Sequence, residues 1–296
     1  MTPEKKNMLV GYAAGILSGA TYGLNPVFGK PLLADGVSVT SMLFLRYAMA
    51  AVILALMMRL EKVRFKVGKG QFAVMTILGL LFTGSSLLMF DAYKYIPSGE
   101  AATIVYLYPV FTALIMIFMK EYPSWKTVLA IVICFGGVCL LCMPGGGVSL
   151  NMFGVGLSVV SALCYALYLV VVNKSKRIGN VSVQTLTLYA LLTGATLLLI
   201  LNMAGGHGLM TGISGARSWL NIIGLAFFPT VISMVGLSVA TRRVGATRAA
   251  ILGVFEPITA IIFGVILFNE PMTFNILSGI VICLTGITFM TLSKGK

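Results

Sequence analysis

The chain has 296 residues, of which 58% are hydrophobic and only 10% are charged, and its mean hydropathy is +1.01. A soluble domain carries about 25% charged residues, so this composition excludes a water-soluble globular protein and predicts a protein embedded in a membrane. The formal net charge of +13 would favour nucleic-acid binding in a soluble domain. In a membrane protein, basic loops on one side explain it better, and no nucleic-acid partner is expected.

Ten apolar runs are long enough to cross a bilayer, which takes roughly 20 mainly apolar residues. In chain order, these predicted spans 1 to 10 cover residues 8–29, 37–58, 71–90, 100–119, 126–143, 152–173, 181–203, 218–240, 248–268 and 273–292. The loops between them are short, so we expect an all-α membrane protein with ten transmembrane helices. The first run is too long for the apolar core of a cleaved signal peptide, and we expect it to be a membrane span.

The basic residues between the spans are distributed unevenly. If the segment before span 1 is cytoplasmic, the outer segments hold only Lys30, Lys94 and Arg217 among the 21 lysines and arginines, and Arg46 lies within a span. The remaining basic residues then face the cytoplasm, as the positive-inside rule requires. This bias predicts a multi-pass protein of the plasma membrane, the inner membrane of a bacterium, with both chain ends cytoplasmic.

One sequence pattern occurs twice, about half a chain apart. Two alanines are followed after six residues by a proline and later by a second proline, in Ala101-Ala102, Pro109, Pro123 and in Ala249-Ala250, Pro257, Pro271. The next spans share a tetrapeptide, Ile131-Val132-Ile133-Cys134 and Ile280-Val281-Ile282-Cys283. The sequence therefore predicts two five-helix repeats, residues 1–143 and 152–296.

The two repeats are expected to lie upside down relative to each other, because each has an odd number of spans. A weaker match of their first spans, Ser18-x-x-x-Tyr22 with Ser161-x-x-x-Tyr165, supports this alignment. Inverted repeats about an axis in the membrane plane are typical of secondary transporters, whose halves exchange conformations to open a central site to either side. The sequence thus predicts a transporter that works by alternating access.

Several short motifs, in their order along the chain, resemble a known family. They are Tyr22-Gly23-Leu24-Asn25 with Lys30, Phe44-Leu45-Arg46, Tyr108-Pro109-Val110-Phe111, Glu256-Pro257-Ile258, and the closing Glu121 and Glu270 of spans 4 and 9. Over its full length the chain resembles the EamA-domain branch of the drug/metabolite transporter (DMT) superfamily. This resemblance implies ten helices, a central cavity lined mainly by spans 1, 3, 4, 6, 8 and 9, and export or exchange of small metabolites.

Span 1 combines a stripe of small residues with a proline. Glycines recur every four residues, at Gly11, Gly15, Gly19 and Gly23. Such a stripe lets helices approach closely, within one chain or between chains. Pro26 then removes one backbone hydrogen bond and frees the carbonyl near Tyr22. Two hypotheses follow: Tyr22 and Asn25 face the cavity, or Pro26 only bends the helix while Asn25 bonds to a neighbouring helix.

Glu256 lies well inside span 9, directly before Pro257. A carboxylate within the membrane is costly unless it is paired, so it is a functional candidate. It could bind a proton for coupling or bind a substrate ammonium group. It could also form a structural pair with Arg46, the clearly intramembrane cation. Tyr108 holds the matching position in the first repeat, as expected if one half carries a specific ligand contact.

Further candidates are aromatic or lie near the predicted outer face. The full set of predicted substrate-binding residues is Tyr22, Asn25, Tyr106, Tyr108, Tyr165, Tyr168, Phe255 and Glu256. An apolar, aromatic cavity with few polar groups suits amphipathic ligands. Lys30, Asp91, Lys94 and Glu100 form a candidate outer gate, in which Asp91 and Lys94 are spaced to pair on one helix face.

Motifs for enzymatic chemistry are missing from the sequence. Without a phosphate-binding glycine loop or a zinc-ligand pattern, we expect no cofactor, no metal site and no enzymatic activity. We predict a secondary transporter, an exporter or exchanger of amino acids or related amphipathic compounds, with the lipid bilayer as its environment and protons as a candidate coupling ion. The alternatives are a multidrug or amphiphile efflux carrier, an integral-membrane enzyme and a membrane scaffold.

Overall fold

The computed structural model describes residues 3–120, 124–142, 151–206, 208–244, 249 and 252–293, and these residues are almost entirely helical. Glu121, Pro123 and Ala250, which the sequence analysis singled out, lie outside the described residues. The helices are α1 (Pro3–Tyr22), α2 (Asn25–Ala34), α3 (Val39–Leu60), α4 (Lys69–Ala92), α5 (Ser98–Val105), α6 (Tyr108–Phe118), α7 (Trp125–Cys142), α8 (Met152–Lys174), η1 (Lys176–Ile178), α9 (Val183–Ala204), α10 (Gly215–Ala226), η2 (Phe227–Ile232), α11 (Ser233–Val244), α13 (Phe255–Phe268) and α14 (Phe274–Ser293).

Within the described part of the chain, six segments are long and apolar enough to cross a membrane. They are Val39–Leu60, Lys69–Ala92, Ser98–Phe118, Met152–Lys174, Val183–Ala204 and Gly215–Thr241. Shorter apolar helices lie at Val128–Leu140, Phe255–Phe268 and Phe274–Phe289, and the pair α1 and α2 covers predicted span 1. The protein is thus an all-α membrane protein, and its segments follow the order of the ten predicted spans.

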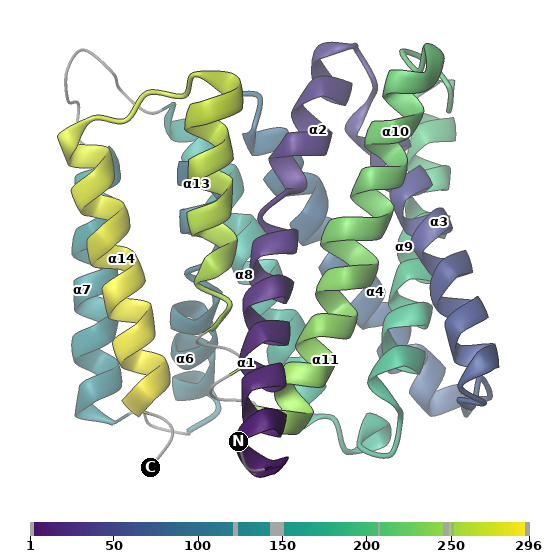
Figure 1. The fold of residues 1–296 in the computed structure, drawn as a ribbon, viewed down its shortest axis with the longest axis horizontal. Helices are drawn as coiled ribbons and strands as arrows, with labels where there is room; N and C mark the ends of the chain where they lie inside the picture. Colours follow the sequence, from purple (N-terminus) through teal and green to yellow (C-terminus); the bar gives the residue numbers. More distant parts are fainter. Residues whose placement is uncertain are drawn as a thin grey trace.

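The helices form two layers that each mix both halves of the chain (Figure 1). One layer contains α1 and α2 beside α10, α11 and α13, whereas the other contains α4, α5 and α6 around α8. The pairs α7–α14 and α3–α9 close the two edges. Helix α1 begins and α14 ends on the same side, which we call the terminal side; the other we call the distal side.

Reciprocal contacts between the layers reveal the inverted repeat. The Ser18 hydroxyl on α1 donates to the Ser233 carbonyl of α11, and the Ser161 hydroxyl on α8 donates to the Ser85 carbonyl of α4, each at 2.7 Å. Ser161 holds the position in the second half that Ser18 holds in the first. A twofold relation produces such paired contacts. The first span of each half therefore packs against the third span of the other half.

The edge pair α7–α14 shows the same reciprocity. The Cys134 thiol lies 3.6 Å from the Cys283 carbonyl, and the Cys283 thiol lies 3.4 Å from the Cys134 carbonyl. A methyl group added at Gly137 would lie 2.6 Å from the Cys283 sulfur, and one at Gly286 would lie 2.7 Å from the Cys134 sulfur. The repeated cysteine and glycine thus form one tight, symmetric helix pair, which explains why both halves carry them.

The glycine stripe of α1 packs within the chain. A methyl group at Gly11 would lie 2.7 Å from Val244, one at Gly15 would collide with Leu252, and one at Gly19 would lie 2.8 Å from the Leu252 carbonyl. The stripe therefore lets α1 lie directly on α11 and on the segment that leads into α13. This confirms close packing as the role of the stripe, and its partner is the same chain.

Candidate functional site

The helices around the middle of the bundle are interrupted just before prolines. The interruptions fall at Gly23–Leu24, Tyr106–Leu107 and Gly253–Val254, ahead of Pro26, Pro109 and Pro257. Proline lacks the N–H that would continue the helix, and its ring clashes with the preceding turn. In α8, which has no proline, the helix runs unbroken from Met152 to Lys174. The repeated alanine–proline pattern thus marks the breaks in spans 4 and 9.

Span 8 contains a fourth irregular segment, the π-helical turn η2, which includes Pro229. Because Pro229 has no N–H, the Leu225 carbonyl four residues earlier lacks its usual donor. The hydroxyl of Thr230 donates to this carbonyl at 3.0 Å. The break in span 1 is resolved in the same way: the Asn25 amide donates at 2.8 Å to the Tyr22 carbonyl, which Pro26 leaves without a donor.

Arg46 on α3 connects these two proline breaks. Its Nη1 donates to Oδ1 of Asn25 at 2.8 Å, and its Nε donates to the hydroxyl of Thr230 at 2.9 Å. The guanidinium lies over the rings of Tyr47 and Phe90, with 5.9 and 5.8 Å to their centroids, and Arg46 is only 1% exposed. We call Arg46, Asn25 and Thr230 the arginine clamp. It holds the irregular segments of spans 1 and 8 together.

The clamp bears on the predictions for Glu256 and Asn25. Glu256 forms no ion pair with any described residue, so the structural pair of Glu256 with Arg46 is not formed. Both polar ends of the Asn25 side chain are engaged, and Asn25 is 2% exposed. Asn25 therefore bonds to the neighbouring helix α3 through Arg46, and the Tyr22 side chain is half-buried.

The predicted tyrosines of spans 4 and 6 form one continuous cluster. Ring centroids are 5.6 Å apart for Tyr106 and Tyr108, 4.7 Å for Tyr108 and Tyr165, and 5.8 Å for Tyr165 and Tyr168. Phe82 on α4 extends the cluster, 5.9 Å from Tyr168. We call these five residues the tyrosine wall. Phe82 was not among the predicted residues, although it lies in span 3, one of the spans that the family resemblance implies to line the cavity.

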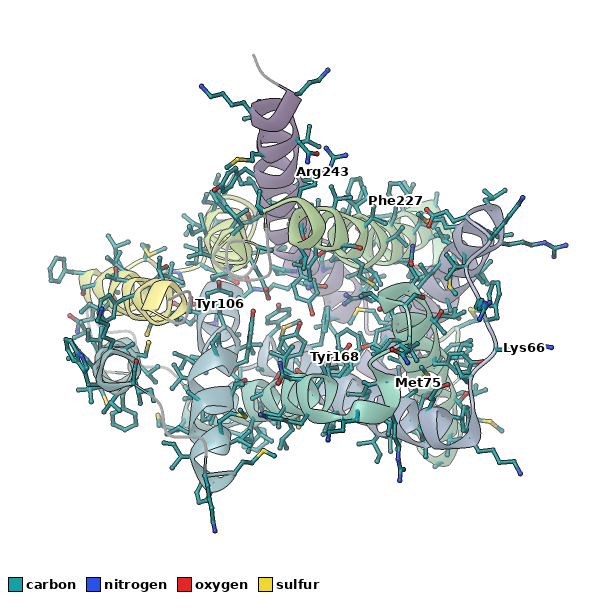
Figure 2. All side chains as sticks on the ribbon, turned by 90° about the horizontal axis from the view of Figure 1, so that it is seen from below. Lys66, Met75, Tyr106, Tyr168, Phe227 and Arg243 are labelled. Atoms are coloured by element: carbon teal, nitrogen blue, oxygen red, sulfur yellow. The ribbon has the colours of Figure 1, made fainter. Side chains whose placement is uncertain are left out.

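The tyrosine wall faces the interior between the two layers. Seen from the terminal side, Tyr106 and Tyr168 both lie toward the middle of the bundle (Figure 2). Tyr106 is 2% exposed, whereas Tyr108, Tyr165 and Tyr168 are half-buried although their helices are packed into the bundle. The half-buried rings therefore border space that solvent or a ligand can reach.

Glu256 lies beside this wall, in the first turn of α13. Glu256 is near enough to Tyr22, Tyr106, Tyr108 and Tyr165 for its charge to act on their hydroxyl groups. The positive end of the α13 dipole favours an acidic residue in this turn, and Glu256 forms no ion pair with any residue that the structure describes. Its side chain is half-buried, as is that of the preceding Phe255. The tyrosines and the carboxylate predicted from sequence thus come together in one place.

The distal ends of spans 1, 4 and 9 are tied together by Glu270. Its carboxylate accepts from Lys30 Nζ at 2.5 Å, from the Ser98 N–H at 2.8 Å and hydroxyl at 2.7 Å, and from the Gly99 N–H at 3.3 Å. Helix α5 begins at Ser98, so Glu270 satisfies the free N–H groups at this helix start. We call Lys30, Glu270, Ser98 and Gly99 the distal latch.

The candidate outer gate is therefore only partly one cluster. Lys30 belongs to the distal latch, but its partner is Glu270. Asp91 and Lys94 form a separate pair at 2.7 Å, with about half of each side chain exposed. Glu100 is 2% exposed and lines a small cavity beside Glu270. Lys30 and Glu270 are 240 positions apart in the sequence, so no local sequence pattern could predict that they pair.

A separate cleft of about 140 Å³ opens away from the tyrosine wall, toward the terminal side, between α3, α9 and α11. Its lining residues are mostly apolar: Leu54, Met57, Met58, Glu61, Val183, Gln184, Met234, Val235, Ser238 and Val239. The Gln184 amide donates to the Glu61 carboxylate at 2.8 Å and ties α9 to α3 at the rim.

Comparisons with known proteins agree with this architecture. The sequence matches the EamA-like transporter family twice, over residues 9–143 and 152–292. It is 28% identical to an "Uncharacterized transporter" of Archaeoglobus fulgidus over 95% of this chain and 96% of that protein, and 26% identical to "Uncharacterized transporter YvbV" of Bacillus subtilis over 91% and 85%. A solved crystal structure shares the fold, with a TM-score of 0.66, 18% identity and coverage of 97% and 96%. The protein is therefore a multi-pass membrane protein that belongs to the EamA-like transporter family.

Proposed function

We propose that the protein is a secondary transporter that exports or exchanges small metabolites, amino acids above all, by alternating access. The observation that carries this proposal is the reciprocal packing of two inverted halves around the tyrosine wall and Glu256, a carboxylate that forms no ion pair with any described residue. Inverted repeats with interrupted helices at the middle of the membrane are the design of many secondary transporters.

In this proposal the two halves, residues 1–143 and 152–296, exchange conformations. The distal latch closes the distal side, because it joins the ends of spans 1, 4 and 9. The substrate then enters from the terminal side. The basic loops of the sequence favour a cytoplasmic terminal side and a bacterial inner membrane. With the distal side as the outer side, this proposal makes the latched conformation an outward-closed state of the carrier.

Glu256 is the proposed site of proton coupling. It is a carboxylate within the membrane that has no cationic partner among the described residues, which is the setting of proton sites in carriers. Replacing Glu256 by Gln should abolish the acceleration of transport by a pH gradient while the fold persists. A pH response equal to that of the wild type would remove Glu256 from this role.

The test of transport is counterflow in proteoliposomes. Pooled labelled amino acids are offered outside, with and without unlabelled amino acids inside, at matched pH and then with a pH step. Uptake that depends on internal substrate would support a carrier. Cysteines placed at the two ends of span 4 should change labelling in opposite senses when substrate is added. Unchanged labelling at both ends would contradict alternating access.

A second candidate function, efflux of apolar amphiphiles, is supported by the cleft between α3, α9 and α11. Three methionines, Met57, Met58 and Met234, contribute to its lining, and flexible methionines adapt to ligands of varied shape. Val235→Trp should fill the cleft. Loss of amphiphile efflux with unchanged amino-acid flux would favour two separate routes, and unchanged efflux would exclude the cleft from transport.

A further inference from the structure

Glu100 is a buried carboxyl group beside the distal latch, but it is not one of the four latch residues. It is the third residue of α5 and is 2% exposed. It forms no ion pair with any residue that the structure describes. A carboxylate that is shielded from water is costly unless a cation or several hydrogen-bond donors compensate its charge. Glu100 therefore needs either such partners or a proton.

Glu100 and Glu270 line the same small cavity. Its volume is about 10 Å³, room for about one water molecule. The rest of the lining is mostly apolar and includes Ile261 and Val265 of α13 and Ile280 of α14. Two carboxyl groups thus share one small space with little polar surface around them. If both were ionised, their charges would repel each other there.

The donors that could favour a charged Glu100 already serve Glu270. Its carboxylate accepts from Lys30 Nζ, from the N–H and hydroxyl of Ser98 and from the N–H of Gly99. The two N–H groups belong to the start of α5, where a carboxylate is otherwise favoured. The Glu270 side chain is 7% exposed, so this carboxylate is also shielded from water. With both glutamates ionised, Lys30 would leave one buried negative charge in excess.

The other helices that pack against α5 do not supply the missing positive charge. They are α4, α8, α13 and α14. Helix α14 contains no charged residue, and α8 has Lys174 at its opposite end. Helix α13 carries Glu256 in its first turn, away from the latch. Helix α4 ends in the buried Tyr93 and in the exposed pair of Asp91 and Lys94, which balance each other.

We propose that Glu100 is a proton-binding site of the distal latch. Glu100 is neutral while Glu270 holds Lys30, and it ionises when the latch opens and water reaches it. Glu270 keeps its charge because several donors favour its carboxylate. In a close pair of carboxyl groups, one group commonly retains a proton for this reason.

The role of this proton in a transport cycle rests on the proposed function. The proton enters and leaves on the distal side, so this site is distinct from the proposed coupling at Glu256. The closed latch holds one proton more than the open latch. Acid on the distal side therefore favours the closed state and alkali the open state, by up to about tenfold in their ratio for each pH unit.

The direct test is infrared spectroscopy of the whole chain in lipid nanodiscs at about pH 6, where an exposed glutamate is ionised. All variants carry Glu256→Gln, which removes the other intramembrane carboxyl group. Adding Glu100→Gln should remove the carbonyl stretch of one neutral carboxyl group. Asp91→Asn, at an exposed and paired carboxylate, is the matched control and should leave this band unchanged. An unchanged band in Glu100→Gln would overturn the proposal.

A second variant leaves Glu100 in place and changes its neighbour. Glu270→Gln removes the competing charge, so Lys30 is free to pair with Glu100. The band of the neutral carboxyl group should therefore be lost in this variant too, because Glu100 ionises. A band of wild-type strength in Glu270→Gln would contradict the charge balance on which the proposal depends.

The response of the latch to pH is measured with two spin labels, at Asp35→Cys and Phe274→Cys, in a chain without its native cysteines. Both positions are exposed, one after α2 and one at the start of α14. The population with the longer distance should grow between about pH 6 and 9, a range in which ordinary glutamate and lysine side chains do not titrate. Glu100→Gln should abolish this dependence. The same dependence in both proteins would refute the proton site.

Counterflow separates this inference from the proposed function. Loss of the infrared band in Glu100→Gln without flux of any pooled solute would support the proton site and contradict transport. Flux in a protein whose band does not change in Glu100→Gln would support transport and contradict the proton site.

Discussion

At the residue scale, the arginine clamp links the hydrogen bonding at two proline breaks to the packing of the helices. Pro26 and Pro229 each leave a carbonyl without its helix donor, and the side chains of Asn25 and Thr230 replace that donor. Arg46 then binds both replacement groups. A buried guanidinium in a membrane protein needs such acceptors in place, because unsatisfied polar groups are costly there. The clamp therefore couples spans 1, 2 and 8.

Substitution of Arg46 tests the clamp. Arg46→Lys keeps the charge, but a lysine ammonium lacks the planar fork that reaches two acceptors at once. We expect the free energy of unfolding to fall by about 1–3 kcal/mol and counterflow to fall with it. Thermal unfolding and proteoliposome uptake are the measurements. Arg59→Lys, at the exposed end of the same helix, is the control, and equal behaviour of the two variants would argue against a clamp.

At the element scale, the interrupted spans place side chains that a straight helix would separate. The turn at Tyr106–Leu107 lets the rings of Tyr106 and Tyr108 meet at 5.6 Å. In span 9 the equivalent turn brings Glu256 to the start of a helix, where its charge is favoured. The repeated proline break thus positions aromatic side chains in the first half and an acidic side chain in the second half.

The break in span 9 can be tested with Pro257→Ala. An alanine restores an N–H at this position, which favours a regular helix through Gly253 and Val254. We expect stability to be retained or slightly raised, and transport to fall because Glu256 turns away from the tyrosines. Pro271→Ala, in the loop before α14, is the matched control. Wild-type flux in Pro257→Ala would show that the break only bends the helix.

The close contact of α1 with span 9 predicts a steric effect at Gly23. A methyl group there would collide with the backbone oxygen of Glu256. Gly23→Ala should therefore destabilise the fold by about 1–3 kcal/mol. Gly156→Ala on α8 is the control, because a methyl group there meets nothing within 4 Å. It should be neutral or stabilise by up to about 1 kcal/mol through helix propensity. Similar unfolding temperatures for both variants would contradict this packing.

At the scale of the whole molecule, the two layers are suited to the alternating access that we propose. Each layer combines spans of both halves, and the contacts between corresponding spans are reciprocal. On the distal side, Glu270 joins the second half to the first through Lys30 and Ser98. In the proposed cycle, opening this side would require those bonds to break, so the distal latch would set part of the free-energy difference between the two states.

Glu270→Gln should weaken the distal latch and shift the protein toward a distally open state. The amide can still accept hydrogen bonds, but it loses the charge that attracts Lys30 and the start of α5. We expect Thr103→Cys, at a buried position one turn into α5, to react several-fold faster with an impermeant maleimide added on the distal side.

The background for this labelling lacks the native cysteines. Asp91→Asn is the control, because it removes an exposed ion pair outside the latch and should leave labelling unchanged. Equal labelling of the Glu270→Gln and Asp91→Asn proteins would refute a gating role for the latch.

The amino-acid sequence by itself determined the membrane class, the order of the spans, the inverted repeat and the prolines at which helices break. These properties are local or periodic: apolar runs report burial in lipid, and proline acts on its own turn. It also singled out Glu256 and the tyrosines, since polar and aromatic residues at membrane depth are rare enough to notice.

Only the tertiary structure decided which of these residues meet. Arg46 and Glu256 looked like a pair because they carry opposite charges, yet Arg46 lies against the breaks of spans 1 and 8. Lys30 pairs with Glu270, whereas Asp91 pairs with Lys94. Partner choice depends on how separate helices cross and rotate, and the packing of the whole bundle sets that geometry. The order of charged residues along the chain does not specify this geometry.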